Sequence, residues 1–207
     1  WALFDAANSG YSTVVLTAVF NAYFVSTICA DAEWATFAWS ATVACGNAAS
    51  MLLMPVIGRM ADLKASKKKW LAAATLLCVA ATALLAFCGP QTYAWAISMI
   101  VASCLGFNVG ETLNSAFLPE IARPEAVGKV SGWGWSLGYV GGLFTLALCL
   151  TVVLVGEKAG FRNDALVAAS CLITAVVFFV LAIPSIVFLK ERSKAQVQEA
   201  TWAEAWR

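Results

Sequence analysis

Five long stretches of the chain contain no charged residue and are rich in apolar side chains. They cover residues 6–30, 34–58, 70–110, 130–156 and 165–189. About 20 apolar residues in a helix cross the hydrocarbon core of a bilayer, so four of these stretches each fit one span. The stretch 70–110 is too long for one helix, and Gly89-Pro90-Gln91 predicts a tight turn within it. The pattern therefore predicts six membrane-spanning helices, at about residues 8–30, 35–57, 70–88, 92–118, 130–155 and 165–189.

The composition supports a membrane environment. Hydrophobic residues make up 61% of the 207 residues, charged residues make up 12%, and the net charge is +1. Soluble domains contain about 25% charged residues, so this chain has too few charges to cover a water-exposed surface. The same values exclude a disordered chain, a basic nucleic-acid binder and an ordinary cytosolic enzyme. We expect an all-α integral membrane protein, with residues 1–189 as one bundle surrounded by lipid and no nucleic-acid partner.

Basic residues predict the orientation of the bundle. Segments 58–69, 119–129 and 190–207 would lie on one side of the membrane, and they contain eleven of the 13 Lys and Arg residues. The loops on the other side contain only two basic residues, Lys158 and Arg162. Because cytoplasmic loops are enriched in Lys and Arg, we expect both termini to be cytoplasmic.

Several kinds of site are absent from the sequence. The chain has no His, so neither a Ser-His-Asp triad nor a Cys-His pair can be built within it. None of the seven cysteines forms a Cys-x-x-Cys pair, and small apolar filler is the favoured interpretation of them. There is no P-loop for ATP hydrolysis. We expect neither an enzyme nor a bound cofactor or metal.

Polar side chains are unevenly placed among the expected spans. The third and sixth spans contain only Ser and Thr besides apolar residues, whereas the first and fourth contain carboxylates and amides. In the fourth, Asn108, Glu111 and Ser115 lie on one helical face. Because polar groups in hydrocarbon are costly, we expect the first and fourth spans to be interior and the third and sixth peripheral. The candidate cavity residues are Asp5, Asn8, Asn21, Asn108, Glu111 and Asn114.

Glu111 is the most informative of these residues. It lies about eight residues from the inner end of its span, which is roughly 12 Å at 1.5 Å per residue. A carboxyl at that depth can hold or release a proton, as cation-coupled transport requires. The alternative is a structural carboxyl that accepts hydrogen bonds from Asn108, Asn114 or a Ser on a neighbouring helix. Interhelical hydrogen bonding is the favoured role for each asparagine taken singly.

Glycines gather at the start of the fifth span. Gly134, Gly138 and Gly142 are four residues apart and form one flat ridge against which another helix can pack. The ridge fits either a sliding surface for a rocking motion or static close packing.

The loop after the second span resembles a known signature. Gly58, Asp62, Lys67 and Lys68 match the G-x-x-x-D-x-x-G-basic-basic pattern between the second and third helices of the major facilitator superfamily. This resemblance implies a loop that takes part in conformational change. The sequence departs from the pattern at Leu63, Ala65 and Ser66. Without the resemblance, the loop is a positive-inside anchor.

Two further segments resemble one branch of that superfamily. Asp5-Ala6-Ala7-Asn8-Ser9 is similar to the D-x-A-N-S start of the vacuole-effluxer-like branch, and segments 114–121 and 127–135 are similar to its fourth-to-fifth helix connection. The resemblance implies an alternating-access carrier of twelve helices, built as two halves that each contain two inverted three-helix repeats. It also implies a cavity lined by the first and fourth helices of each half. Members of this branch are associated with amino-acid export from the fungal vacuole.

We therefore expect this chain to be the N-terminal half of a secondary transporter of a small solute, with residues 190–207 as a cytoplasmic amphipathic linker to a C-terminal six-helix half. Amino-acid efflux is the candidate activity, a proton or sodium is the candidate coupling ion, and we favour the bacterial inner membrane over the fungal vacuole. In such a half, Asn21, Asn108, Glu111 and the glycine ridge would lack partners within the chain. Two alternatives stay open: a complete six-span protein that acts as a homodimer, and a non-transporting receptor or assembly subunit.

Overall fold

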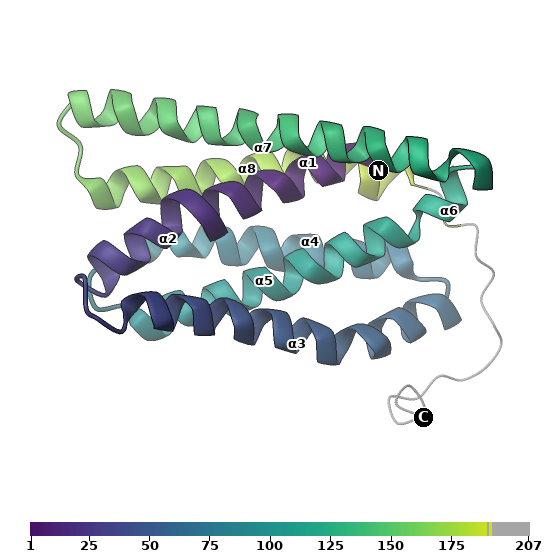
Figure 1. Ribbon diagram of the computed structural model, residues 1–207, viewed down its shortest axis with the longest axis horizontal. Coiled ribbons are helices and arrows are strands. Elements are labelled where there is room, and N and C mark those ends of the chain that lie inside the picture. Colours follow the sequence, from purple (N-terminus) through teal and green to yellow (C-terminus); the bar gives the residue numbers. More distant parts are fainter. Residues whose placement is uncertain (190, 192–207) are drawn as a thin grey trace.

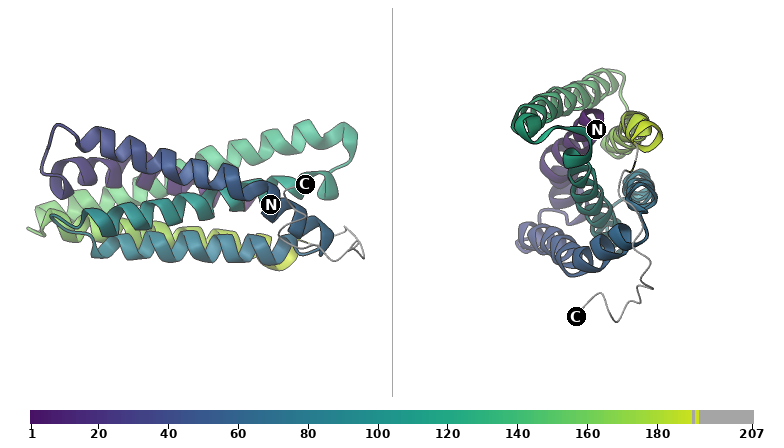
Figure 2. Two further views of the ribbon diagram at one scale, coloured as in Figure 1. Left: turned by 90° about the horizontal axis from the view of Figure 1, so that it is seen from below. Right: turned by 90° about the vertical axis from the view of Figure 1, so that its right-hand side faces the viewer.

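The computed structural model describes residues 1–189 and 191, and it is an elongated bundle of helices that run along one long axis (Figures 1 and 2). No strand occurs within these residues. Six helical stretches among them are long and apolar enough to cross a membrane, which confirms the expected all-α membrane fold. The expected linker over 190–207 lies outside the described residues, apart from Glu191.

The first stretch combines α-helical and π-helical segments. It consists of α1 (Ala2–Tyr11), η1 (Ser12–Ala18), α2 (Val19–Tyr23) and η2 (Phe24–Ile28), of which η1 and η2 are π-helical. The helix begins at Ala2 rather than near residue 8. Asp5 is therefore in the first helical turn, where the partial positive charge of the helix N-terminus favours a carboxylate.

The remaining stretches are simpler. They are α3 (Ala35–Leu63), α4 (Lys67–Leu84) with the short 3-10 helix η3 (Leu85–Phe87), α5 (Tyr93–Ala116) with α6 (Leu118–Ile121), the 3-10 helix η4 (Pro124–Ala126) with α7 (Val127–Lys158), and α8 (Asn163–Phe188). The loops before α4 and between α5 and α7 lie at the same end of the bundle as the N-terminus (Figure 1).

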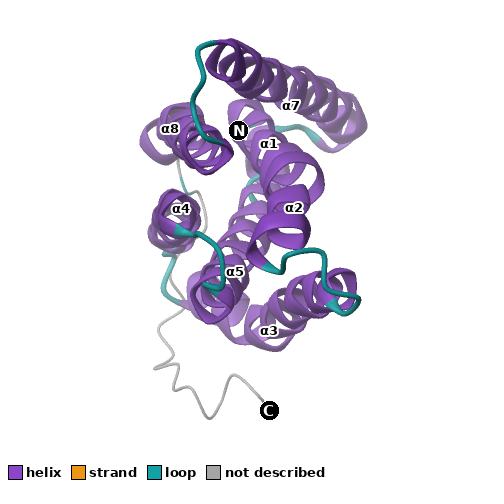
Figure 3. Ribbon diagram, turned by 90° about the vertical axis from the view of Figure 1, so that its left-hand side faces the viewer, coloured by secondary structure: helices purple, strands orange, loops and turns teal. Residues whose placement is uncertain are grey.

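The first three spans and the last three spans form two units, and each unit packs helices against the first span of the other. Helices α7 and α8 pack on α1, whereas α3 and α4 pack on α5. Each three-span unit therefore packs its second and third spans against the first span of the other unit. Figure 3 shows the result: α1, α2 and α5 occupy the centre, α3 and α7 lie at opposite ends, and α4 and α8 lie side by side. This arrangement fits half of a major-facilitator fold.

The third and sixth spans are less peripheral than their composition predicts. In the most apolar part of each helix, 39% of the third span and 44% of the sixth are buried, against 39% of the first and of the fourth. Three of their hydroxyls, those of Thr75, Ser170 and Thr174, bond to carbonyls of their own helix, as in Thr75 Oγ1 to Leu71 O at 2.8 Å and Ser170 Oγ to Leu166 O at 2.9 Å. Because these three groups need no outside partner, the helices can bury them against neighbouring helices, whereas Thr82 Oγ1 and Ser185 Oγ are buried without such a bond.

The glycine ridge of α7 packs on the first span, along α1 and the start of η1. A Cβ added at Gly138 would lie 3.0 Å from Ser9 Oγ, and one added at Gly142 would lie 3.2 Å from Thr13 Oγ1. At Gly134 it would overlap the Trp1 ring. The expectation that this surface has no partner within the chain is therefore wrong, because the first span fills it.

Candidate functional site

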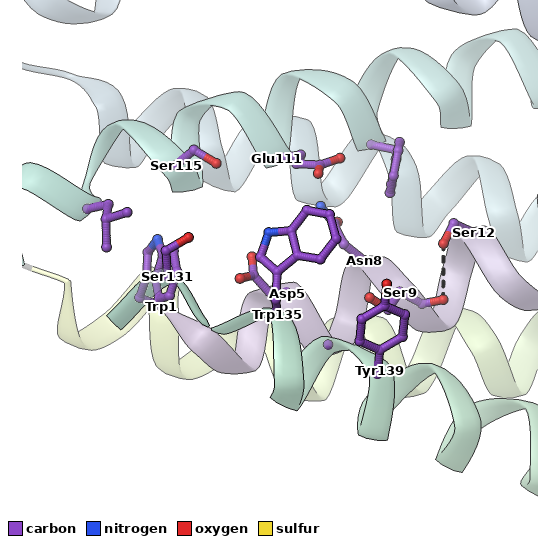
Figure 4. Close-up of a pocket in the computed structure, with 13 residues that line it drawn as sticks. Trp1, Asp5, Asn8, Ser9, Ser12, Glu111, Ser115, Ser131, Trp135 and Tyr139 are labelled. Carbon is purple, nitrogen blue, oxygen red and sulfur yellow. Dashed lines mark hydrogen bonds between the residues drawn. The ribbon is translucent and has the colours of Figure 1, made fainter. Parts of the chain in front are cut away.

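A pocket of about 240 Å³ lies among α1, α5 and α7 (Figure 4). It is polar along α1 and α5 and aromatic along α7. Its lining residues are Trp1, Asp5, Asn8, Ser9, Ser12, Phe107, Glu111, Ser115, Leu118, Ser131, Trp135, Gly138 and Tyr139.

Asp5 is held in place from behind the pocket. Its Oδ1 accepts a hydrogen bond from Asn114 Nδ2 at 3.1 Å, and the Asn114 carbonyl accepts one from Trp1 Nε1 at 2.8 Å. Asn114 is fully buried and does not itself line the pocket. It therefore orients the carboxylate rather than facing the cavity.

Asn8 is buried without hydrogen-bond partners. Asn8 lies one turn after Asp5 and is 5% exposed. Neither the oxygen nor the nitrogen of its side-chain amide has a hydrogen-bond partner among the described residues. A buried amide that makes no hydrogen bond costs roughly 1–3 kcal/mol. This side chain at the pocket wall is thus able to gain a hydrogen bond from a bound molecule.

Glu111 lines the pocket from α5. Its side chain is exposed, and it forms no ion pair or hydrogen bond with any described residue. Ser115 lies one turn further along the same wall (Figure 4). Asn21, Asn108 and Glu111 are expected from the sequence to lack hydrogen-bond partners, and of these three only Glu111 has none among the described residues.

The α7 wall is aromatic. Trp135 and Tyr139 are one turn apart, 66% and 67% exposed, and their ring centroids are 6.2 Å apart at an interplanar angle of 62°. These two residues are not among the cavity residues expected from the sequence. The four-residue spacing of Ser131, Trp135 and Tyr139, next to the glycine ridge, is the signal that could have found them.

Besides Asn114, two further expected cavity residues do not line the pocket. Asn108 Nδ2 donates to Asn47 Oδ1 at 2.9 Å and to Ser50 Oγ at 3.2 Å, so it links α5 to α3. The expectation that Asn108 lacks a partner is therefore wrong. Asn21 is in α2, outside the pocket, and its Nδ2 donates to Thr17 O at 3.5 Å.

The loop with the signature residues binds two other segments at its end of the bundle. Lys67 Nζ lies 3.1 Å from Asp62 Oδ1 and 3.0 Å from Glu120 Oε1, and the Lys67 backbone N–H donates to Glu191 Oε1 at 2.8 Å. Lys68 Nζ donates to the Val187 carbonyl at 2.8 Å. These contacts connect the α3–α4 loop to α6 and to the end of α8. Gly58 makes no close approach to a neighbour.

The pocket joins two carboxylates, an unpartnered amide and several hydroxyls to aromatic surfaces. Such a set can balance the charge of a cation, accept hydrogen bonds from it and hold a proton. None of the thirteen lining residues is Lys or Arg.

Comparison with known proteins assigns a family to this arrangement. The chain is 29% identical over 197 residues to YxiO of Bacillus subtilis (strain 168), described as an uncharacterized MFS-type transporter. That alignment covers 93% of this chain and 46% of the relative, so the chain spans about half the length of the curated relative that it matches. No solved structure gives a significant match. Residues 35–207 match the family described as "Vacuole effluxer Atg22 like". The chain belongs to this vacuole effluxer-like family, a branch of the major-facilitator type of membrane transporter.

Proposed function

We propose that this chain forms one six-helix half of a secondary transporter that moves a small solute by alternating access. The pocket among α1, α5 and α7 is this half's contribution to the solute cavity. The observation that carries the proposal is the gathering of Asp5, Asn8 and Glu111 at one pocket within otherwise apolar spanning helices. Polar groups at membrane depth mark solute and ion pathways because burying them in lipid is costly.

The second half is proposed from the length of the relative. Carriers with inverted repeats bind their solute between two halves, each supplying one wall of the cavity. This chain spans 46% of a relative described as a transporter, which fits one half of such a carrier. The apolar, exposed side chains of α7 fit a surface that meets lipid or another helix.

Amino-acid efflux is the proposed activity. The family description names an effluxer, and the resemblance of segments 5–9, 114–121 and 127–135 links the chain to a branch associated with amino-acid export. A pocket with hydroxyls, carboxylates and aromatic rings can bind both the polar end and the apolar side chain of such a solute.

Glu111 is the proposed coupling carboxyl. It lines the pocket and forms no hydrogen bond or ion pair with a described residue, so protonation would not break an existing contact. Asp5 is instead held by Asn114, which suits a fixed binding group. Solute and proton would then share one cavity.

Reconstitution of the full-length protein tests this proposal. Proteoliposomes are loaded with a panel of radiolabelled amino acids, and efflux is measured with and without a proton gradient. We expect gradient-driven efflux that the substitution Glu111→Gln abolishes, while exchange without a gradient persists at saturating solute, because glutamine keeps the shape and loses the titratable proton. Glu157→Gln, at the far end of α7, is the matched control. Unchanged gradient dependence in Glu111→Gln would contradict the coupling role, and no solute flux at all would contradict the transporter.

A further inference from the structure

We infer that the pocket recognises the protonated amino group of its solute, with Asp5 and Glu111 as the charge partners and the α7 aromatic side chains as the wall beside it. This inference rests on the proposed transport function, since it names the chemical class of the solute at the same site. It assigns to this half of the carrier the cationic end of the solute.

The pocket is lined by two acidic side chains and by no basic side chain. Asp5 lies on α1 and Glu111 on α5, and both line the same cavity. Neither forms an ion pair with a described residue, and no Lys or Arg lines the pocket. Two carboxylates that face one cavity with no basic side chain between them repel each other, so a bound cation stabilises this arrangement whereas an anion opposes it.

Asn8 provides an independent sign of a ligand. It lines the pocket, it is more than nine-tenths buried, and both polar atoms of its side chain lack a partner among the described residues. Buried amides in native structures are nearly always hydrogen-bonded. Its Oδ1 is an acceptor for an ammonium N–H, and the residue lies between Asp5 in α1 and Ser12 at the start of η1.

The aromatic wall separates an organic ammonium from a bare metal ion. Trp135 and Tyr139 lie at the pocket on α7 (Figure 4), and Phe107 on α5 also lines it. Aromatic faces attract organic cations and also contact the carbon skeleton attached to the nitrogen. A pocket of about 240 Å³ is far larger than a dehydrated alkali ion requires, and no described cluster of three or more acidic, Cys or His residues could hold a metal.

Three probes with the same phenylethyl skeleton test the inference. Phenethylamine carries an ammonium group, 2-phenylethanol is neutral, and 3-phenylpropionate carries a carboxylate. Binding to the purified full-length protein is measured by calorimetry at pH 7 in potassium chloride. We expect phenethylamine to bind at least about tenfold more tightly than either analogue, because one charge-assisted contact is worth about that factor. Equal or tighter binding of the alcohol or the acid would overturn the inference, and this comparison needs no variant.

Variants then assign the recognition to the residues. We expect Glu111→Gln to weaken phenethylamine binding about tenfold and Trp135→Leu about threefold, the latter through loss of the cation–π contact. The alcohol should lose less than the amine in Glu111→Gln, and Glu157→Gln should bind both as the parent does. Equal losses for amine and alcohol would overturn the role of the charge. Replacement of potassium by sodium should not change the affinity, and a sodium response without an amine response would identify a metal-ion site instead.

The same preparation separates this inference from the transport proposal. Solute efflux with no preference for the amine contradicts the ammonium site and leaves the transporter standing. Selective amine binding with no flux of any solute contradicts the transporter and leaves the ammonium site standing.

Discussion

At Gly141, α7 approaches α1 so closely that no side chain fits between them. A Cβ added there would overlap the side chain of Ala6, and the Ala6 Cα would lie 2.7 Å away. We expect Gly141→Ala to destabilise the full-length protein by about 1–3 kcal/mol, because both neighbouring atoms belong to a packed helix that must shift. Thermal unfolding in detergent, followed by tryptophan fluorescence, measures the loss. Gly132→Ala is the control, since nothing lies within 4 Å of its added Cβ, and equal melting of the two variants would contradict the packing argument.

The acidic residues of the site could be predicted from the sequence more readily than the residues with which the polar side chains form hydrogen bonds. Asp5 and Glu111 stand out in the sequence because carboxylates are costly in membrane-spanning helices and are therefore rare there unless they have a function. The binding of Asn108 to Asn47 on α3 could not be predicted, since both are neutral amides on helices whose relative rotation the sequence does not specify. Trp135 is typical of a headgroup-level residue by pattern, and its place at the pocket depends on the close α1–α7 contact.

At the scale of elements, Lys67 holds three segments together at one end of the bundle. Its side chain is 13% exposed and Glu120 is 14% exposed, so the pair is largely removed from water, whereas Asp62 is 65% exposed. We expect Lys67→Ala to cost about 1–3 kcal/mol, more than a surface pair, because it removes the cation beside a partly buried carboxylate. Hydrogen exchange at residues 118–122 should speed up. Lys69→Ala, an exposed neighbour in the same helix, should leave that exchange unchanged, and faster exchange in both variants would point to a general effect of loop charge.

The number of helices could be predicted because charge is excluded from hydrocarbon, whereas the helix ends could not. The first helix extends back to Ala2, past Asp5 and Asn8, because the bundle and the pocket surround these polar groups. Similarly, the glycine spacing predicts close packing of α7, but only the fold identifies α1 as its partner. Periodicity describes a helix face, and the neighbour of that face depends on the exchange of partners between the two three-span units.

For the whole molecule, the distribution of basic residues predicts the topology. The α3–α4 loop and the α5–α7 connection share one end of the bundle with the N-terminus, and the turns near residues 90 and 160 lie at the other (Figure 1). Reporter fusions at residues 64 and 125 should therefore be cytoplasmic, and fusions at 90 and 160 external, by the positive-inside rule. An external report at residue 64 would invert the entire arrangement.

The open pocket predicts how residues 1–207 behave when expressed alone. The helices exchange partners, the glycine ridge is filled by α1, and Asn108 is bonded to α3, so the bundle should insert and hold its fold without a second half. Glu111 and Ser115 nevertheless stay exposed beside the pocket, and the cavity would have walls from one half only. Alternating access requires a second half that moves against the first.

We therefore expect the isolated segment to reach the membrane with the same topology as the longer protein and to give no solute flux in vesicles. Co-expression with a downstream six-span half should restore flux, and Glu111→Gln in the segment should remove its gradient dependence again. The oligomeric state of the purified segment, measured in detergent, is the accompanying control. Saturable flux from a homodimer of the segment would show that two copies of this chain complete the cavity, and would replace the half-transporter with a six-span carrier.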